Sequence, residues 1–221
     1  MLMYVYPGGA NIDGFYVYPY YVTVDGGTPM QMMCDDFTDE ISGGESWYAY
    51  ANTLTQDNQG NLANASQFLF DKSTSIYGAG STTQAPTTAV RAYDEAAYIF
   101  TDMSAGTISA TEGNLAVWYL FSPSAAPVDA TALGILNQAN IFVRAHPGQD
   151  YSYITVYSPT PDGAISPSNA GRAQEFFAIN SGVSVTPLSA VPEPPPSLLL
   201  AVGGALIGLV GLVRRKRFAR P

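Results

Sequence analysis

Residues 87–123 read TTAVRAYDEAAYIFTDMSAGTISATEGNLAVWYLFSP, and in this stretch the apolar pattern changes from that of strands to that of helices. Apolar side chains recur at the spacing of one helix face: Val90, Tyr93, Ala97 and Phe100. Thr87 or Thr88 can cap this helix at its start. Thr111 can cap a second helix, which stops before Pro123. We therefore expect two consecutive helices at the centre of the chain.

A third helix is expected directly after these two. Asp129 can cap it, and one of its faces carries Leu133, Leu136, Asn140 and Val143. The sequence His146-Pro147-Gly148 ends it and places the only histidine at a helix C-terminus, where a partly charged imidazole is favourable. Residues 61–71 are a weaker candidate for a fourth helix.

Strand character flanks the helical centre on both sides. Residues 15–24 (FYVYPYYVTV) are aromatic and β-branched, and Pro19 favours an edge strand or a bulge there. The other expected strands are 30–37, 46–53, 151–157, 174–179 and 183–186. Strands followed by helices and then again by strands indicate the α+β class, as a β-rich domain with an inserted helical segment.

The C-terminus combines a proline cluster, an apolar run and a basic cluster. At about 1.5 Å rise per residue, the apolar run reaches about 25 Å, enough for one short transmembrane helix. Cations are retained on the cytoplasmic side, so the domain before them is expected outside the membrane. The expected organisation is an extracytoplasmic domain in residues 1–189, a Pro-rich stalk in 190–196, a transmembrane helix in 197–213 and a basic cytoplasmic tail in 214–221.

This combination resembles the PEP-CTERM sorting signal of Gram-negative bacteria. The matching residues are Pro192, Glu193, Pro194, Arg214, Arg215, Lys216 and Arg217. The resemblance implies recognition by an exosortase, a membrane cysteine protease-transpeptidase, and contact with membrane lipid. It also implies an inner-membrane precursor with its N-terminus outside and a cell-surface or extracellular product after cleavage. Proteins with this signal commonly accompany exopolysaccharide production, so exopolysaccharide or another surface component is a candidate partner.

Charge is distributed unevenly along the chain. Residues 1–190 hold 17 acidic and 4 basic side chains, a balance of −13, whereas residues 191–221 hold 1 and 5, a balance of +4. A domain this acidic, without a basic stripe, argues against nucleic acid as a partner. The single cysteine, Cys34, excludes an internal disulfide. Residues 1–6 show no signal peptide, which an outward-facing domain needs, so we expect a leader upstream of this Met1.

Two pieces of the domain carry a second resemblance. The first piece is residues 33–37 (MCDDF) followed by 43–47 (GGESW), and the second is residues 114–119 (NLAVWY), preceded by 95–99 (EAAYI). Together they look like the thioester-domain family of bacterial surface adhesins. The Gln-Glu-Phe-Phe sequence at 174–177 also recurs in such proteins. In that family a Cys thiol and a Gln carboxamide condense, with loss of ammonia, into an internal thioester.

The resemblance places Cys34 at the Cys position and Asn114 at the Gln position. Asn is one methylene shorter than Gln, so the same backbone geometry leaves its carbonyl about 1.5 Å short of the sulfur. A misplacement of this size disables covalent chemistry. We therefore expect a domain that keeps the scaffold without the reactive bond, with Cys34 as a half-buried thiol and the pair as a vestigial thioester position.

Other candidate sites are weaker. The acidic cluster Asp35, Asp36, Asp39 and Glu40 can be a Ca²⁺ site or a solvated turn, and it matches no known calcium motif. Trp47 and Trp118 can stack on sugar rings but are more often core residues. The lone His146 gives little support to a histidine metal site or a Ser-His-Asp triad. No phosphate loop or dinucleotide fingerprint is present, so no metal or other cofactor is expected.

These observations favour an exported, non-enzymatic protein with a structural or adhesive role in the envelope, extracellular matrix or biofilm. One alternative is a covalent adhesin with a working Cys thioester. Another, weaker alternative is an extracellular glycan-binding module or hydrolase.

Overall fold

A computed structural model gives the fold of the chain and describes residues 1–7, 10–12, 14–39, 41–57, 60–70, 88–127, 129–161 and 173–188. It separates the chain into two units, Met1–Leu188 and Ser189–Pro221. The expected stalk, apolar run and basic tail all lie outside the described residues.

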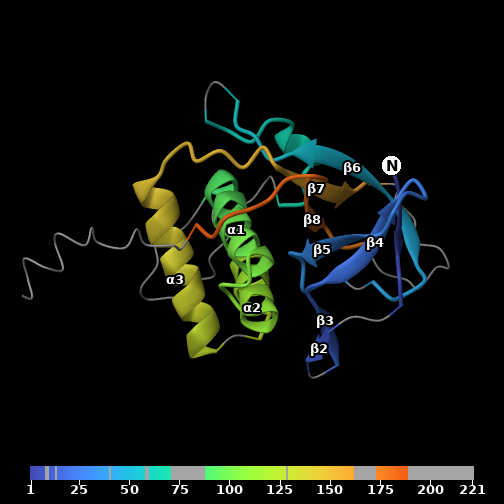
Figure 1. The fold of residues 1–221 in the computed structure, drawn as a ribbon, viewed down its shortest axis with the longest axis horizontal. Coiled ribbons are helices and arrows are strands. Elements are labelled where there is room, and N and C mark those ends of the chain that lie inside the picture. Colours follow the sequence, from blue (N-terminus) through green and yellow to red (C-terminus); the bar gives the residue numbers. More distant parts are fainter. Residues whose placement is uncertain are drawn as a thin grey trace, which may run out of the picture. The chain divides into compact units, whose positions relative to one another are not determined.

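Eight strands, one short 3-10 turn and three helices make up the described part of the chain (Figure 1). Their bounds are β1 Leu2–Val5, β2 Ala10–Ile12, β3 Phe15–Val17, β4 Tyr20–Val24, β5 Met30–Cys34, β6 Ser46–Thr53, η1 Ala65–Gln67, α1 Ala89–Ser104, α2 Ala110–Phe121, α3 Ala130–Ala145, β7 Ile154–Pro159 and β8 Phe176–Ile179. All three helices therefore lie between β6 and β7 in the chain.

Six of the strands close into an antiparallel barrel in the order β1-β4-β5-β8-β7-β6, and β1 also pairs with β6. The expected α+β class is therefore wrong for the domain. The order of strands and helices along a chain does not reveal whether the first and last strands of a sheet meet. Closure removes both exposed sheet edges. β2 and β3 form a separate hairpin that projects from the barrel (Figure 1).

The barrel interior follows the two-residue period of its strands. On β5, Met32 and Cys34 belong to the cluster inside the barrel, whereas Met33 between them packs on the helices. On β8, Phe176 faces inward and Phe177 faces the helices. A six-stranded barrel has a narrow interior, which its own side chains fill. Trp47 lies 5.6 Å from Phe176, ring centre to ring centre, at the middle of this filling.

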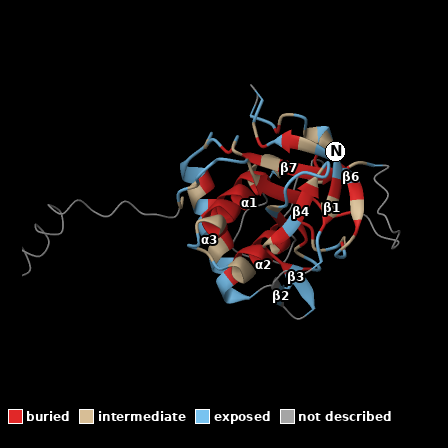
Figure 2. Ribbon diagram, turned by 45° about the vertical axis from the view of Figure 1, so that its right-hand side comes forward, coloured by how far each residue is buried: buried red, intermediate tan, exposed pale blue. Residues whose placement is uncertain are grey.

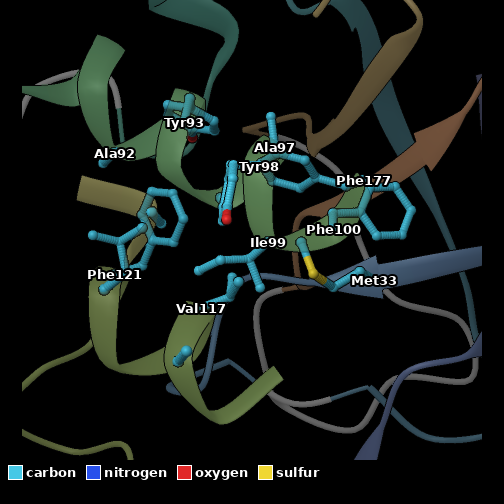
Figure 3. Packing of buried hydrophobic residues seen from close by; sticks show 14 of the residues in the cluster. Met33, Ala92, Tyr93, Ala97, Tyr98, Ile99, Phe100, Val117, Phe121 and Phe177 are labelled. Atoms are coloured by element: carbon cyan, nitrogen blue, oxygen red, sulfur yellow. The ribbon is translucent and has the colours of Figure 1, made fainter. Parts of the chain in front are cut away.

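The three helices cover one side of the barrel (Figures 1 and 2). Every residue from Ala92 to Met103 on α1 is buried. Figure 3 shows Phe100 of α1 beside Met33 and Phe177, which project from the outer face of the barrel wall. The main core is therefore the layer between barrel and helices, and a second, smaller core fills the barrel.

Local capping explains where the helices begin. The Thr88 hydroxyl accepts from Arg91 N at 3.4 Å, and the Asp129 carboxylate accepts from Ala132 N at 2.8 Å, so both expected caps are confirmed. The expected cap of the second helix, Thr111, is wrong, because Ser109 caps α2 two residues earlier by accepting from Glu112 N. Both residue types can cap a helix.

Several other expectations need correction. β1 was not expected, and residues 15–24 form two strands separated by a cis Tyr18–Pro19 bond. Residues 61–70 contain only the short turn η1, and residues 183–186 form no strand. The strand at 46–53 is confirmed with its expected bounds. Within the described ranges, none of the helices combines the length and the apolar character that a membrane crossing requires.

Candidate functional site

Cys34 lies at the end of β5 with its side chain inside the barrel. Its thiol is fully buried, not half-buried as expected, and donates a hydrogen bond to Asp36 O at 3.0 Å. Burial raises the pKa of the thiol well above its usual value, and the charges of Asp35 and Asp36 raise it further. A thiol that stays protonated at neutral pH is a poor nucleophile.

Asn114 projects from α2 onto the backbone of β5, and it is also fully buried. Its amide nitrogen donates to Cys34 O at 3.0 Å, and its oxygen accepts from Tyr18 N at 2.7 Å. The structure therefore brings together the two positions that the sequence singled out. Both ends of the carboxamide bond to main chain, so Asn114 ties α2 to β5 and to the link between β3 and β4.

A pair of buried carboxyl groups lies beside this contact. Glu175 accepts from the Tyr93 hydroxyl through Oε1 and from Leu69 N through Oε2, the latter at 2.9 Å. Neither carboxyl oxygen of Asp35 has a hydrogen-bond donor among the described groups, and Glu175 is the charged group that most raises its pKa after burial itself. Burial also raises the pKa of Glu175.

Two facing carboxyl groups without a cation cannot both ionise at low cost. One proton shared between them turns the repulsion into a hydrogen bond, with protonated Asp35 donating to Glu175. The two groups therefore titrate as a coupled pair. Glu175 lies directly before β8 and faces Asp35 at the end of β5. Its hydrogen bond from Tyr93 connects this pair to α1, and its hydrogen bond from Leu69 connects it to the segment after η1.

The acidic cluster that was weighed as a Ca²⁺ site or a solvated turn is divided between different roles, and its member Glu40 lies outside the described residues. Asp36 is buried and accepts from Thr38 N at 2.8 Å and from the Thr38 hydroxyl at 2.9 Å, so it closes a local turn. Asp35 points instead toward Glu175. The solvated turn offered as an alternative is also wrong, because Asp35 and Asp36 are both buried. Within the described ranges, no group of three or more His, Cys, Asp or Glu side chains is placed to hold a metal ion.

The remaining candidates from the sequence are structural. Trp47 and Trp118 are 0% and 2% exposed, so neither offers a ring face to a sugar. His146 ends α3, where Nδ1 lies 2.9 Å from Phe142 O and the ring stacks on Phe142 at 4.2 Å. The sorting residues Pro192, Glu193, Pro194, Arg214, Arg215, Lys216 and Arg217 lie outside the described residues.

A surface pocket of about 190 Å³ is lined by residues of β3, β4, α2 and the segment after β5. Its walls are largely aromatic: Phe15, Tyr16, Tyr20, Phe37 and Trp118. Phe15 and Tyr16, from β3, are 43% and 39% exposed. Gln174 supplies a polar group, and its amide nitrogen is held by Asp36 O at 2.9 Å. This arrangement combines exposed ring faces with a fixed amide.

The sequence indicates Gln174 and Glu175 only as part of a recurring tetrapeptide. It gives no sign that the Tyr93 hydroxyl donates to Glu175. A charged residue directly before the apolar strand Phe176–Ile179 is a usable signal, because such a residue needs a partner when the strand is buried. The identity of that partner is not local information, since Tyr93 lies 82 residues away.

Comparison of the chain with protein-family models, with curated protein sequences and with solved structures finds no match. The interpretation of function therefore depends on the residues described above and on the C-terminal sequence.

Proposed function

We propose that this chain is an exported, non-enzymatic protein with a structural or adhesive role at the cell surface or in the extracellular matrix. The observation that carries the proposal is the C-terminal succession of Pro192-Glu193-Pro194, the apolar run 197–213 and Arg214-Arg215-Lys216-Arg217. The first unit ends at Leu188, so the sorting signal begins directly after it. An exosortase that cleaves near the prolines would release an intact folded domain.

The Cys34–Asn114 contact favours a non-covalent role for the domain. The Asn114 amide nitrogen bonds to the main-chain carbonyl of Cys34 and not to its sulfur. The thiol itself is committed to Asp36 O and is closed off from solvent. An adhesin that captures an amine covalently needs an accessible electrophile, and this pair is arranged as a structural tie between α2 and β5.

Fractionation of cells with and without the exosortase tests the sorting proposal. With the enzyme, we expect a shortened product at the surface or in the medium, cut near Pro192–Pro194. Without it, we expect the full-length chain in the inner membrane. A full-length chain in the cytosol of both strains would contradict the proposal.

Intact mass of the purified domain tests the covalent alternative in the same preparation. A thioester between Cys34 and Asn114 removes one ammonia, about 17 Da. We expect the unmodified mass and a thiol that reacts with alkylating reagents only after unfolding. A mass deficit of about 17 Da that methylamine abolishes would favour the covalent adhesin.

Saccharide binding at the aromatic pocket is a second candidate function, favoured by the exposed rings of Phe15 and Tyr16 beside Gln174. Aromatic faces next to a few fixed polar groups are typical of small-molecule sites. We expect Tyr16→Ala to reduce binding on a glycan array at least tenfold. Tyr48→Ala, at a 57% exposed tyrosine on β6, is the matched control and should retain binding. Equal binding by both variants would rule out this pocket.

A further inference from the structure

A second pocket, of about 260 Å³, lies on the helical side of the fold and is partly open to solvent. It is formed by the segment after β6, by α1 and by the loop between α3 and β7. Its polar lining comprises Thr55, Gln56, Asp94, Gln149, Asp150 and Tyr151. Among the described residues that form its wall, none is Lys or Arg, so the pocket is negatively charged and lacks a cation of its own.

Asp94 is the central polar group of this pocket. It is 9% exposed, and Gln56 Nε2 donates to its Oδ2 at 3.1 Å. Gln56 is a neutral donor, so it satisfies one oxygen without balancing the charge. Beside it, Tyr151 is 2% exposed and its hydroxyl has no hydrogen-bond partner among the described groups. A buried carboxylate and an unpartnered buried hydroxyl at one pocket are costly unless a ligand completes them.

Charged neighbours define the electrostatics of the pocket. The pKa of Asp94 is raised to about 7, first by burial and then by the charge of Glu95, while Gln56 and Arg91 act in the opposite direction. Across the pocket, Asp150 accepts from Ser152 N at 2.8 Å, which lowers its pKa and keeps it ionised. The charged groups around Asp94 are thus Arg91 on its own helix and the carboxylates of Glu95 and Asp150.

We infer that this pocket binds a small hydroxylated amine, with the ammonium group on the Asp94 carboxylate and the hydroxyl groups on Gln56 and Gln149. Asp150 adds a second negative charge at the rim. An ammonium group donates three hydrogen bonds and supplies the missing positive charge. This inference does not depend on the proposed surface role, because it uses only residues of the pocket.

Other classes of ligand fit the pocket less well. Anions would meet two carboxylates without a compensating cation. A calcium ion needs six to eight oxygen ligands. Within the described ranges, no cluster of three ligating side chains is present at this pocket or elsewhere. The volume suits a small molecule of a few carbon atoms or one sugar ring.

The pair 3-amino-1,2-propanediol and glycerol tests the inference, because the two molecules differ by one ammonium in place of one hydroxyl. We expect calorimetry or NMR titration of the intact protein at pH 7.5 to show at least tenfold tighter binding of the amine. The aliphatic amine stays protonated in this range, as lysine does. Between pH 6 and pH 8 the affinity should rise about tenfold, following the ionisation of Asp94 with its pKa of about 7.

Asp94→Asn keeps the shape of the side chain and its contact with Gln56 but removes the charge. We expect it to lose at least tenfold in affinity for the amine and to lose the pH dependence. Its thermal unfolding midpoint at pH 8 should equal or exceed that of the wild type, which separates lost binding from misfolding. Glu112→Gln, on α2 and outside the pocket, is the matched control and should bind normally.

Two results would overturn the inference. One is equal binding of the amine and glycerol by the wild type. The other is a folded Asp94→Asn variant whose affinity for the amine matches that of the wild type.

Discussion

At the level of single residues, three buried carboxyl groups in the described part of the chain have pKa values raised by their burial: Asp35, Glu175 and Asp94. Asp35 and Glu175 face each other in the barrel wall, and Asp94 meets mainly amide and hydroxyl groups beside the second pocket. Burial favours the protonated form of Asp35 beside Glu175, and it moves the pKa of Asp94 to about 7. The acidic composition, which suggests only a charged surface, therefore also places titrating acids in the interior.

These groups make stability depend on pH. An acid whose pKa is raised on folding contributes stability that is fully present below its unfolded pKa, near 4, and is lost as the pH rises through the folded pKa. For Asp94 this window runs from about 4 to about 7. We expect the thermal unfolding midpoint to be higher at pH 5 than at pH 8, as measured by circular dichroism.

Asp35→Asn tests the contribution of the carboxyl pair. The amide always carries a hydrogen that it can donate to Glu175, so one titrating group disappears while the contact remains. We expect a smaller loss of stability between pH 5 and pH 8 in this variant, and at pH 8 a midpoint at least equal to that of the wild type. Asp94 still titrates and leaves a residual slope. An unchanged slope would mean that Asp35 and Glu175 do not share a proton.

At the level of elements, one close contact between two segments depends on a glycine, because a larger residue would collide with the neighbouring backbone. A Cβ atom added at Gly43 would lie 2.4 Å from Pro7 Cα, where the loop before β6 crosses the residues after β1. That neighbour is backbone and cannot move without shifting the end of β1. At Gly134 of α3, by contrast, nothing lies within 4 Å of an added Cβ. The same substitution should therefore have opposite effects at the two positions.

We expect Gly43→Ala to destabilise the domain by about 1–3 kcal/mol, the usual cost of overpacking. Gly134→Ala should stabilise it by about 0.5–1 kcal/mol, because alanine loses less backbone entropy than glycine in a helix. Urea unfolding of both variants at one pH measures the two free energies. A Gly43→Ala variant at least as stable as the wild type would show that the contact with Pro7 does not constrain the loop.

At the level of the whole molecule, the domain ends by returning to its helices. The segment after β8 runs back from the barrel toward the helical layer (Figure 1). There Leu188 packs against the main core and its N–H donates to the Asp102 carboxylate at 2.6 Å. Asp102 lies on the buried helix α1, so this last contact stabilises a carboxylate that is otherwise costly to bury.

Truncation tests where the folded unit ends. A chain of residues 1–188 should keep the same thermal unfolding midpoint as the full-length chain, because it retains every described contact of the first unit. A chain of residues 1–182 loses the hydrogen bond to Asp102 and the packing of Leu188, and should be less stable by about 2 kcal/mol or more. Equal midpoints for the two truncated chains would place the end of the folded unit before residue 183.

The sequence by itself determined the features that depend on near neighbours. Helix periodicity and capping by Thr88 and Asp129 involve residues three or four positions apart, so they can be recognised in one window. The strand at 46–53 follows in the same way from its composition. The C-terminal succession of prolines, apolar residues and cations is likewise a local pattern, and it remains the basis of the proposed sorting.

Only the tertiary structure decided that the sheet closes and which polar groups meet inside it. β1 pairs with β6 more than 40 residues later, as in Met3 with Trp47, and Glu175 meets Tyr93 across 82 residues. Strand pairs and buried polar contacts join residues that lie far apart in the chain. No repeating pattern of the sequence shows which of these residues will meet. These contacts are selected by the burial of the whole core and by the hydrogen bonds that form within it, and no single window of sequence contains that information.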